Sequence, residues 1–460
     1  MCEENFWDCT PRGAKRYRQS LYLHLVFSMA SEGVTNLGID KFFEKNSELH
    51  SGWLRSLHSI AERSFEEQET SNFIYSILKE QCPSLKVTRG LNDELPTAVL
   101  AVHTPRDPTL SPILLRADMD GLPIRGTDGT PSPLHPDVHH ACGHDGHVTC
   151  LLTCAHWIHN FRDLTHRKVV LFFQPAEERG VAAIGGSGAR IAVERGELLD
   201  TLHSDVEAVY ALHSWPGLEV GHFGVGAGPM MGSSSKFVIE FAGHGGHAAM
   251  TSEEGGDALL AACTMVTCAQ AVIARGTDAF IPAAVAFTSV ENVDSHALGA
   301  IPSQVRVCGT FRTLDTQTKE SILKQLRRHA AGAATMHGCQ GNVLFTDGYP
   351  VTRNSSDGAL VAQFAALRAV GGDESKVHSV GVEEGMLKPI LCSEDFSILL
   401  KKRAGAYVWL GNGSGGPRLH ESSYRFDERA VPFGGKLFVH LATSPATVGK
   451  NPNRAEFGIA

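Results

Sequence analysis

The sequence has no run of residues that is long and apolar enough to be a firm membrane span. Its longest mainly apolar stretch without charge, residues 258–274, stays just under the roughly 20 residues that a spanning helix needs. The stretch also contains Thr264, Thr267 and Gln270, which favour a helix packed on two sides. We therefore expect no membrane partner.

An excess of basic residues and a disulfide framework are also missing. The chain has 41 Lys and Arg against 50 Asp and Glu, and its net charge of −9 argues against nucleic acid as a partner. Its 11 cysteines are odd in number and spread over 460 residues, whereas disulfide frameworks are dense and occur in short chains. These cysteines indicate a reducing compartment, and we expect a cytoplasmic protein.

The composition is that of a folded protein, with 42% hydrophobic and 20% charged residues. At roughly 150 residues per domain, the length predicts two or three domains. Residues 1–38 have two interpretations. Basic residues ahead of the apolar run 21–30 resemble the start of a signal peptide or a transit peptide, but the favoured interpretation is a disordered extension ahead of the fold.

The pattern after residue 39 predicts an α/β fold. Residues 39–81 have apolar side chains at helical spacings, and a further helix is expected over 145–161. Short apolar runs predict strands at 97–102, 113–115, 168–173, 206–212 and 406–410. This alternation favours a parallel or mostly parallel sheet covered by helices.

The order of elements changes between residues 230 and 348. Strands are expected at 236–241, 283–290, 304–312 and 342–345, with helices at 257–274 and 316–331. This β-α-β-β-α-β order is ferredoxin-like. We therefore expect a catalytic domain formed by residues 39–229 and 349–460, with residues 230–348 inserted as a lid domain.

Polar clusters follow three of the predicted strands. The strand at 113–115 leads into Arg116–Asp120, the strand at 168–173 leads into Gln174–Glu178, and the strand at 206–212 ends at His213. Ligands of open α/β sheets bind beyond the carboxyl ends of the strands, so these residues mark a candidate site. For Glu177 and Glu178 alone, the alternative is a solvated acidic helix start.

The segment HHACGHDGH, residues 139–147, is the strongest signal. Cys142 and His144 place a thiolate and an imidazole two residues apart, and these ligands suit zinc or a similar divalent metal. The alternative is a helix start capped by Asp145, with histidines that only face solvent. Four histidines, a cysteine and an aspartate within nine residues favour the metal site.

These segments resemble the metal-dependent N-acyl-amino-acid amidohydrolases, a family that includes hippurate hydrolase-like enzymes and plant auxin–amino acid conjugate hydrolases. The resemblance rests on RADMDGLPI (116–124), HHACGHDGH (139–147), QPAEE (174–178), GGHAAM (245–250), GTFRT (309–313) and CSEDFS (392–397). It implies a zinc-peptidase-like α/β catalytic domain with a ferredoxin-like lid, in agreement with the order of elements.

The resemblance also implies a two-metal centre that binds zinc, manganese or cobalt. Its ligands would be Cys142, His144, Glu178, His213 and His420. Glu177 would be the general base for a metal-activated water, and Asp120 would orient the centre. His247 would help to bind the scissile carbonyl, across a dimer interface formed by the lid. Arg312 is a candidate anchor for a substrate carboxylate, and the alternative is a surface arginine of a strand.

The chain departs from the family pattern at several positions. Thr251 follows HAAM where the family has Pro, and Gly299 stands where a substrate-binding Asn is usual. Arg125 and Gly126 replace the usual acid after L-P-I, and Ala61 replaces a proline of the N-terminal pattern. None of these departures removes an implied metal ligand or the base.

The function expected from the sequence is hydrolysis of the amide bond of small N-acyl amino acids. A dipeptidase or carboxypeptidase with the same centre is one alternative, and a metal-binding homologue with impaired catalysis is another. The charge-free helix at 258–274 could cover the lid sheet with one face and a second subunit with the other, so we expect a homodimer.

Overall fold

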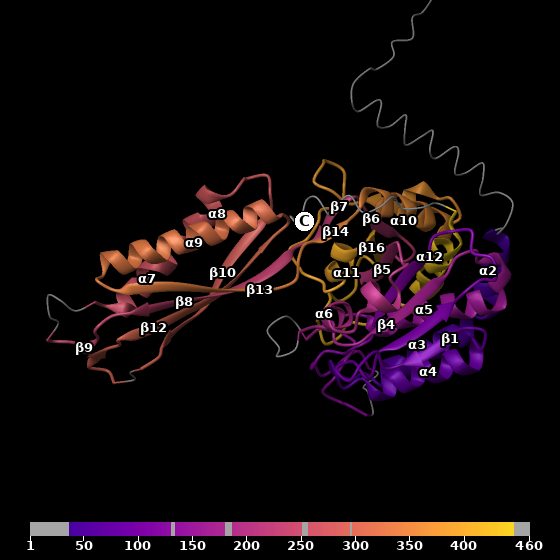
Figure 1. Cartoon of the computed structure of the whole chain (residues 1–460), viewed down its shortest axis with the longest axis horizontal. Helices are drawn as coiled ribbons and strands as arrows, with labels where there is room; N and C mark the ends of the chain where they lie inside the picture. Colours follow the sequence, from indigo (N-terminus) through magenta and orange to yellow (C-terminus); the bar gives the residue numbers. More distant parts are fainter. Residues whose placement is uncertain (1–35, 130–133, 180–185, 251–255, 295–296, 446–460) are drawn as a thin grey trace, which may run out of the picture.

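The computed structural model describes residues 36–129, 134–179, 186–250, 256–294 and 297–445. Two lobes are each built on their own sheet, and the narrower lobe projects away from the larger one (Figure 1). The larger lobe contains segments from both ends of the described chain, and the narrower lobe comes from the middle. The α/β fold class is thereby confirmed, and the domain boundaries at 230 and 348 stay a prediction.

The larger lobe is built on an eight-stranded mixed sheet with the order β1-β2-β4-β3-β5-β16-β6-β15. Its strands are β1 (Lys86–Arg89), β2 (Val99–His103), β3 (Ile113–Asp118), β4 (Val169–Gln174), β5 (Ala208–Trp215), β6 (Phe223–Val225), β15 (Val377–Ser379) and β16 (Ala404–Gly411). The central strands β4, β3, β5 and β16 are parallel, as expected. The pairs β1–β2, β2–β4 and β6–β16 are antiparallel, whereas the flanking pair β6–β15 is parallel, so the sheet is mostly parallel but not entirely so. The short connection from β1 to β2 leaves no room for a parallel crossover.

Helices cover both faces of this sheet, and β3 and β4 are therefore buried along their whole length. Six helices contribute to the core on one face: α2 (Asn36–Lys45), α3 (Ser47–Ser59), α4 (Gln68–Gln81), α5 (His144–Asn160), α10 (Ser356–Ala369) and α12 (Val431–Thr443). The core on the other face includes α6 (Gly188–Glu194), the π-helical turn η2 (Leu198–Leu202) and α11 (Ser397–Lys402). Short 3-10 turns lie at η1 (Arg162–Leu164), η3 (Glu374–Lys376) and η4 (Glu428–Ala430).

The narrower lobe has the predicted ferredoxin-like order. Its antiparallel sheet runs β10-β12-β8-β13, with β8 (Ser233–Ala242), β10 (Ala283–Asn292), β12 (Gln304–Thr313) and β13 (Gln340–Asp347). Helices α7 (Ala258–Ala269), α8 (Ala271–Gly276) and α9 (Thr316–Met336) contribute to its core. Two small ribbons complete the fold: β9 (Gly246–His247) pairs with β11 (Ala300–Ile301), and β7 (Gly228–Met231) pairs with β14 (Thr352–Asn354).

The apolar stretch 258–274 differs from its prediction in two ways. It forms two helices separated at Gln270 instead of one helix. It also packs on one side only within the chain: α7 buries Ala261 and Met265 against the sheet, while Leu259 and Leu260 are 43% and 49% exposed. Among the described residues, no helix combines the length and hydropathy needed to cross a membrane.

The close packing of α5 predicts an asymmetric response to alanine. A Cβ atom at Gly146 would lie 2.1 Å from ring carbons of Phe426, whereas a Cβ at Gly52 in α3 meets nothing within 4 Å. Gly146→Ala should lower the free energy of unfolding of the larger lobe by about 1–3 kcal/mol through overpacking. Gly52→Ala, the matched control, should stabilise it by about 0.5–1 kcal/mol, since alanine is the better helix former. Thermal unfolding of the two variants checks the difference, and equal melting temperatures would contradict it.

Candidate metal centre

The acidic and histidine-rich segments meet at the carboxyl ends of β3, β4 and β5, where the sequence predicts them. β3 extends further than expected and includes Arg116 and Asp118, and β5 continues past His213 to Trp215. His144 begins α5 directly after Gly143, which has a positive φ of 82°. A Cβ at Gly143 would lie 2.5 Å from the Ser214 Oγ, so only glycine fits this turn between the loop and the helix.

The five predicted metal ligands lie in overlapping groups of close donor atoms. Ligand atoms of Cys142, Glu178 and His420 lie within 4.8 Å of one another, and so do those of His144, Glu177 and Glu178. A third group joins His144 and His213 to Asp118 and His147. The structure therefore brings all five side chains into one region, together with Glu177.

Individual distances are those expected of donors facing a common point. The Cys142 Sγ lies 3.3 Å from the His213 Nε2, and the His420 Nε2 lies 3.3 Å from the Glu178 Oε1. Adjacent ligands of a tetrahedral ion with bonds near 2.0–2.2 Å are separated by about 3.3–3.6 Å. The His144 Nε2 and the Glu178 Oε1 are both buried without a hydrogen-bond partner in the described chain. A divalent ion fits this donor set.

Two of the histidines have their second ring nitrogen fixed. The His213 Nδ1 donates to the carbonyl oxygen of Ser214 at 2.8 Å, which leaves the Nε2 lone pair for a ligand. The His144 Nδ1 lies 3.2 Å from the Asp120 Oδ1. Asp120 also accepts hydrogen bonds from the Ser64 hydroxyl and the Glu178 backbone N–H, so its carboxylate connects three segments of the site. Such outer contacts orient metal-binding histidines.

The carboxylates of the site create a negative potential that a bound cation would offset. Burial and the nearby Glu178 and Glu177 raise the pKa of the Cys142 thiol well above its usual range. Burial alone would lower the pKa of His144, but the Asp118 and Asp120 carboxylates outweigh it and raise that pKa to about 10. A bound divalent cation would favour the thiolate and replace the proton on the imidazole.

Glu177 is only 7% exposed, and one of its carboxylate oxygens lies within 4.8 Å of oxygens of Glu394 and Asp395, which together form a carboxylate group. Burial, followed by Glu394 and Glu178, raises the pKa of Glu177 well above its usual range. A raised pKa makes a carboxylate a stronger proton acceptor once it is ionised. The preceding residue, Ala176, has a positive φ of 57°, and its N–H donates to the buried Glu67 carboxylate.

Sequence reasoning missed four residues around this centre. Asp118 and His147 join the donor group, with the Asp118 Oδ1 2.6 Å from the His147 Nδ1. Glu394 and Asp395 accept hydrogen bonds from the buried Arg116 guanidinium. The signal was present in RADMDGLPI, HHACGHDGH and CSEDFS, but the sequence did not distinguish ligands from neighbouring residues.

His247 and Arg312, the two lid residues of the predicted site, lie apart from the metal ligands. His247 is exposed on β9, which lies at the far end of the narrower lobe (Figure 1). Near it, the Gly299 carbonyl accepts a hydrogen bond from the Ala248 N–H, while Thr251 lies outside the described residues. The structure thus does not bring His247 to the metal ligands of its own chain.

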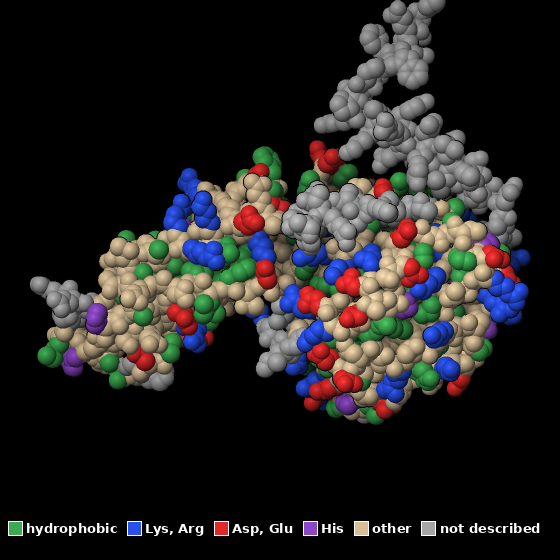
Figure 2. Space-filling view, in the orientation of Figure 1, with side chains coloured by type: hydrophobic (Ala, Val, Ile, Leu, Met, Phe, Trp, Pro, Cys, Tyr) green, Lys and Arg blue, Asp and Glu red, His purple; other side chains and the backbone are tan. Residues whose placement is uncertain are grey.

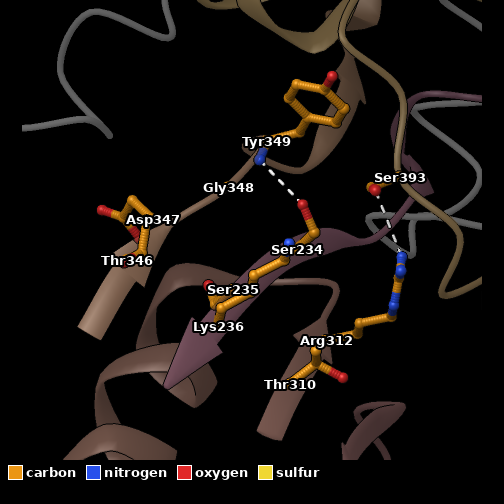
Figure 3. A pocket seen from close by; sticks show the side chains of 10 residues that line it. All are labelled: Ser234, Ser235, Lys236, Thr310, Arg312, Thr346, Asp347, Gly348, Tyr349 and Ser393. Atoms are coloured by element: carbon orange, nitrogen blue, oxygen red, sulfur yellow. Dashed lines mark hydrogen bonds between the residues drawn. The ribbon is translucent and has the colours of Figure 1, made fainter. Parts of the chain in front are cut away.

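Arg312 lies at the junction of the two lobes. Its Nη1 donates to the Leu391 carbonyl at 3.1 Å and to the Ser393 Oγ at 3.3 Å. It lines a cavity of about 150 Å³ together with Ser234, Lys236 and Tyr349 (Figure 3). Ser393, which also lines the cavity, directly precedes Glu394 of the carboxylate group that contains Glu177.

Comparison with known proteins agrees with this geometry. Residues 114–444 match the peptidase family M20/M25/M40. The chain is 32% identical over 391 residues to the N-acetylcysteine deacetylase of Bacillus subtilis, covering 84% of this chain and 94% of the relative. It is 31% identical over 403 residues to the IAA-amino acid hydrolase ILR1-like 2 of Arabidopsis thaliana, covering 84% and 83%.

A solved structure of similar fold is the YXEP protein of Bacillus subtilis, described as a dinuclear metal binding peptidase from the M20 family. The two chains superpose with a TM-score of 0.71 and 28% identity, over 88% of this chain and all of the other. The chain belongs to peptidase family M20/M25/M40, and the resemblance inferred from its motifs is confirmed.

Proposed function

We propose that this protein is a metal-dependent amidohydrolase that cleaves the amide bond of N-acyl amino acids. The observation that carries the proposal is the gathering of five donor side chains, in overlapping groups of close ligand atoms, in one region beside Glu177. The donors are Cys142, His144, Glu178, His213 and His420. The deacetylase and conjugate hydrolase activities named for the relatives support the same substrate class.

The five donors would hold two divalent ions. A cysteine and three histidines favour zinc, and manganese or cobalt also suits a mixed nitrogen and oxygen set. When bound, the two ions lower the pKa of a water molecule and polarise the carbonyl of the substrate amide.

Residues of the chain then carry out the proton transfers. Glu177 accepts a proton from the attacking water as the C–O bond forms, and later gives that proton to the amine as the C–N bond breaks. The products are a carboxylic acid and an amino acid. Asp120 keeps the His144 Nδ1 protonated, so that the His144 Nε2 stays available as a ligand.

Replacing the base tests this mechanism directly. Glu177→Gln should lower kcat by about 100- to 10,000-fold, because the amide cannot accept the proton, while metal content stays that of the wild type. Metal analysis and hydrolysis of a panel of N-acetyl amino acids are measured on the same preparations. A variant that keeps wild-type turnover refutes the role of Glu177. A wild-type protein that cleaves dipeptides in preference to N-acyl amino acids identifies a dipeptidase, and a wild type without turnover identifies an impaired homologue.

We further propose that Arg312 binds the substrate carboxylate. It is a half-buried cation that connects the lid to the segment before Glu394 and borders a cavity large enough for a small anionic group. Guanidinium groups bind carboxylates through paired hydrogen bonds. Gly299 stands in place of the expected asparagine, and Arg312 would supply carboxylate recognition without it.

Arg312→Gln should therefore raise KM for N-acetyl amino acids by about 10- to 100-fold, the cost of losing a charged hydrogen bond. N-acetyl amino acid amides, which lack the carboxylate, should show little change. Arg306→Gln is the matched control, since Arg306 lies on the same strand and pairs with the exposed Glu240. Equal losses on both substrate types would show that Arg312 has only a structural role.

We propose a homodimer formed through the lid domain, residues 230–348. Its support is the pair of exposed leucines on α7, together with the free edge of the ten-residue strand β10. The exposed position of His247 at the tip of the lid fits a role in the partner's site, as donor to the scissile carbonyl.

The free thiols of every cysteine that the structure describes support a reducing, cytoplasmic location.

Mixing two inactive variants tests the shared site. Glu177→Gln and His247→Ala should each be inactive alone, and a refolded mixture should regain about a quarter of wild-type activity. Half of randomly paired dimers are mixed, and each contains one intact site. Light scattering gives the mass in the same samples. A monomer at micromolar concentration, or a mixture that stays inactive, contradicts the proposal.

A further inference from the structure

A second cluster of metal-ligand side chains lies beside the centre but shares no residue with it. His58 at the end of α3, Asp128 in the loop after β3, and His139 before α5 each place a ligand atom within 4.8 Å of the others. The side chains of His58 and Asp128 are 6% and 2% exposed, and His139 is buried as well. Helix α3 and two positions of the connection between β3 and α5 thus bring two imidazoles and a carboxylate to one buried point.

One ring nitrogen of each histidine is held by an acceptor. The His58 Nδ1 lies 2.7 Å from the Asp145 Oδ2. The His139 Nε2 lies 2.7 Å from the carbonyl oxygen of Tyr424. Since a carbonyl only accepts, the His139 Nε2 carries the hydrogen and the lone pair is on Nδ1. Metal-ligating histidines are usually oriented in this way, by a carboxylate or carbonyl on the second nitrogen.

One pair of atoms in the cluster is spaced as neighbouring ligands of a small cation, and the third ligand atom lies within 4.8 Å of both. The His58 Nε2 lies 3.0 Å from the Asp128 Oδ2, close to the separation of about 3.3 Å between neighbouring ligands of tetrahedral zinc. A Cβ at position 126 would lie 2.9 Å from the His139 Nδ1, so a side chain at Gly126 would crowd this nitrogen. Gly126 and Arg125 stand where an acid is usual in sequences that this chain resembles.

A proton between His58 and Asp128 would be the simplest occupant of this point. Burial would lower the pKa of His58, but its contacts with Asp145 and Asp128 outweigh burial and raise it. The cluster therefore stabilises one positive charge in either case. A proton engages only His58 and Asp128, whereas a metal ion uses all three side chains.

We propose that His58, Asp128 and His139 bind a third divalent ion, of the zinc class, separate from the two catalytic ions. Two imidazoles and one carboxylate, with a water as fourth ligand, are a suitable set for zinc. The ion would connect α3, the loop after β3 and the segment before α5, with Tyr424 and Asp145 as outer contacts. Its role is to hold the loop that leads into Cys142 and His144.

The experiment is a zinc count on the full-length protein. Metal is removed with a chelator, the chain is reloaded with zinc and dialysed, and zinc per chain is measured by mass spectrometry. The wild type should hold three ions, and Asp128→Asn and His139→Gln should each hold two. Asp137→Asn, which changes an exposed acid of the same loop, should hold three. Circular dichroism verifies that each variant is folded.

Anomalous diffraction at the zinc edge locates the ions in wild-type crystals and does not depend on any variant. A third peak between His58, Asp128 and His139 supports the proposal. Two ions per wild-type chain, or three in Asp128→Asn, would overturn it. The result is independent of amide hydrolysis, since an inactive protein with three ions refutes only the proposed function, and an active one with two refutes only the third site.

Discussion

The buried guanidinium of Arg116 is the interaction on which the catalytic lobe depends. It is fully buried, and it donates to Asp118 on its own strand, to Gln174 on β4, and to Glu394 and Asp395 before α11. Without this cation, the acidic side chains beneath the metal centre would repel one another in a medium of low dielectric constant. The position of Glu177 therefore depends on a charge balance that reaches across the sheet, and not only on the strand that carries it.

The metal centre uses backbone strain as well as charge. His420 has a φ of 68°, a conformation that residues other than glycine rarely adopt, and its N–H donates to the Ala141 carbonyl. Ala176, next to Glu177, is in a similar region. His420 is itself an implied metal ligand and Ala176 directly precedes Glu177, so each backbone conformation helps to fix the direction of a side chain of the site. On the face shown in Figure 2, acidic and basic side chains are interspersed over the larger lobe.

The sequence was sufficient to predict the architecture and the donor types. Periodicity placed the helix that became α5 and the strands that became β4, β10 and β12 within about two residues, because their apolar faces are regular. It did not reveal β1, whose four residues are mostly exposed, or the antiparallel flanks of the sheet. His420 was found only through resemblance, since its spacing from the other ligands carries no signal. The pairing of Arg116 with Glu394 and Asp395 joins residues nearly 280 positions apart, and no local pattern encodes such a contact.

The position of β16 in the sheet has a consequence for how the chain is made. This strand lies between β5 and β6, yet it is synthesised after the whole of the narrower lobe. Residues 233–347 form a contiguous set of strands and helices that can fold as they leave the ribosome. The larger sheet, by contrast, stays open in its middle until residue 411 is available, and His420 emerges later still. The metal centre thus cannot be complete before the middle strand of the sheet is available, so a chain with a full set of ligands is also one whose central sheet can close.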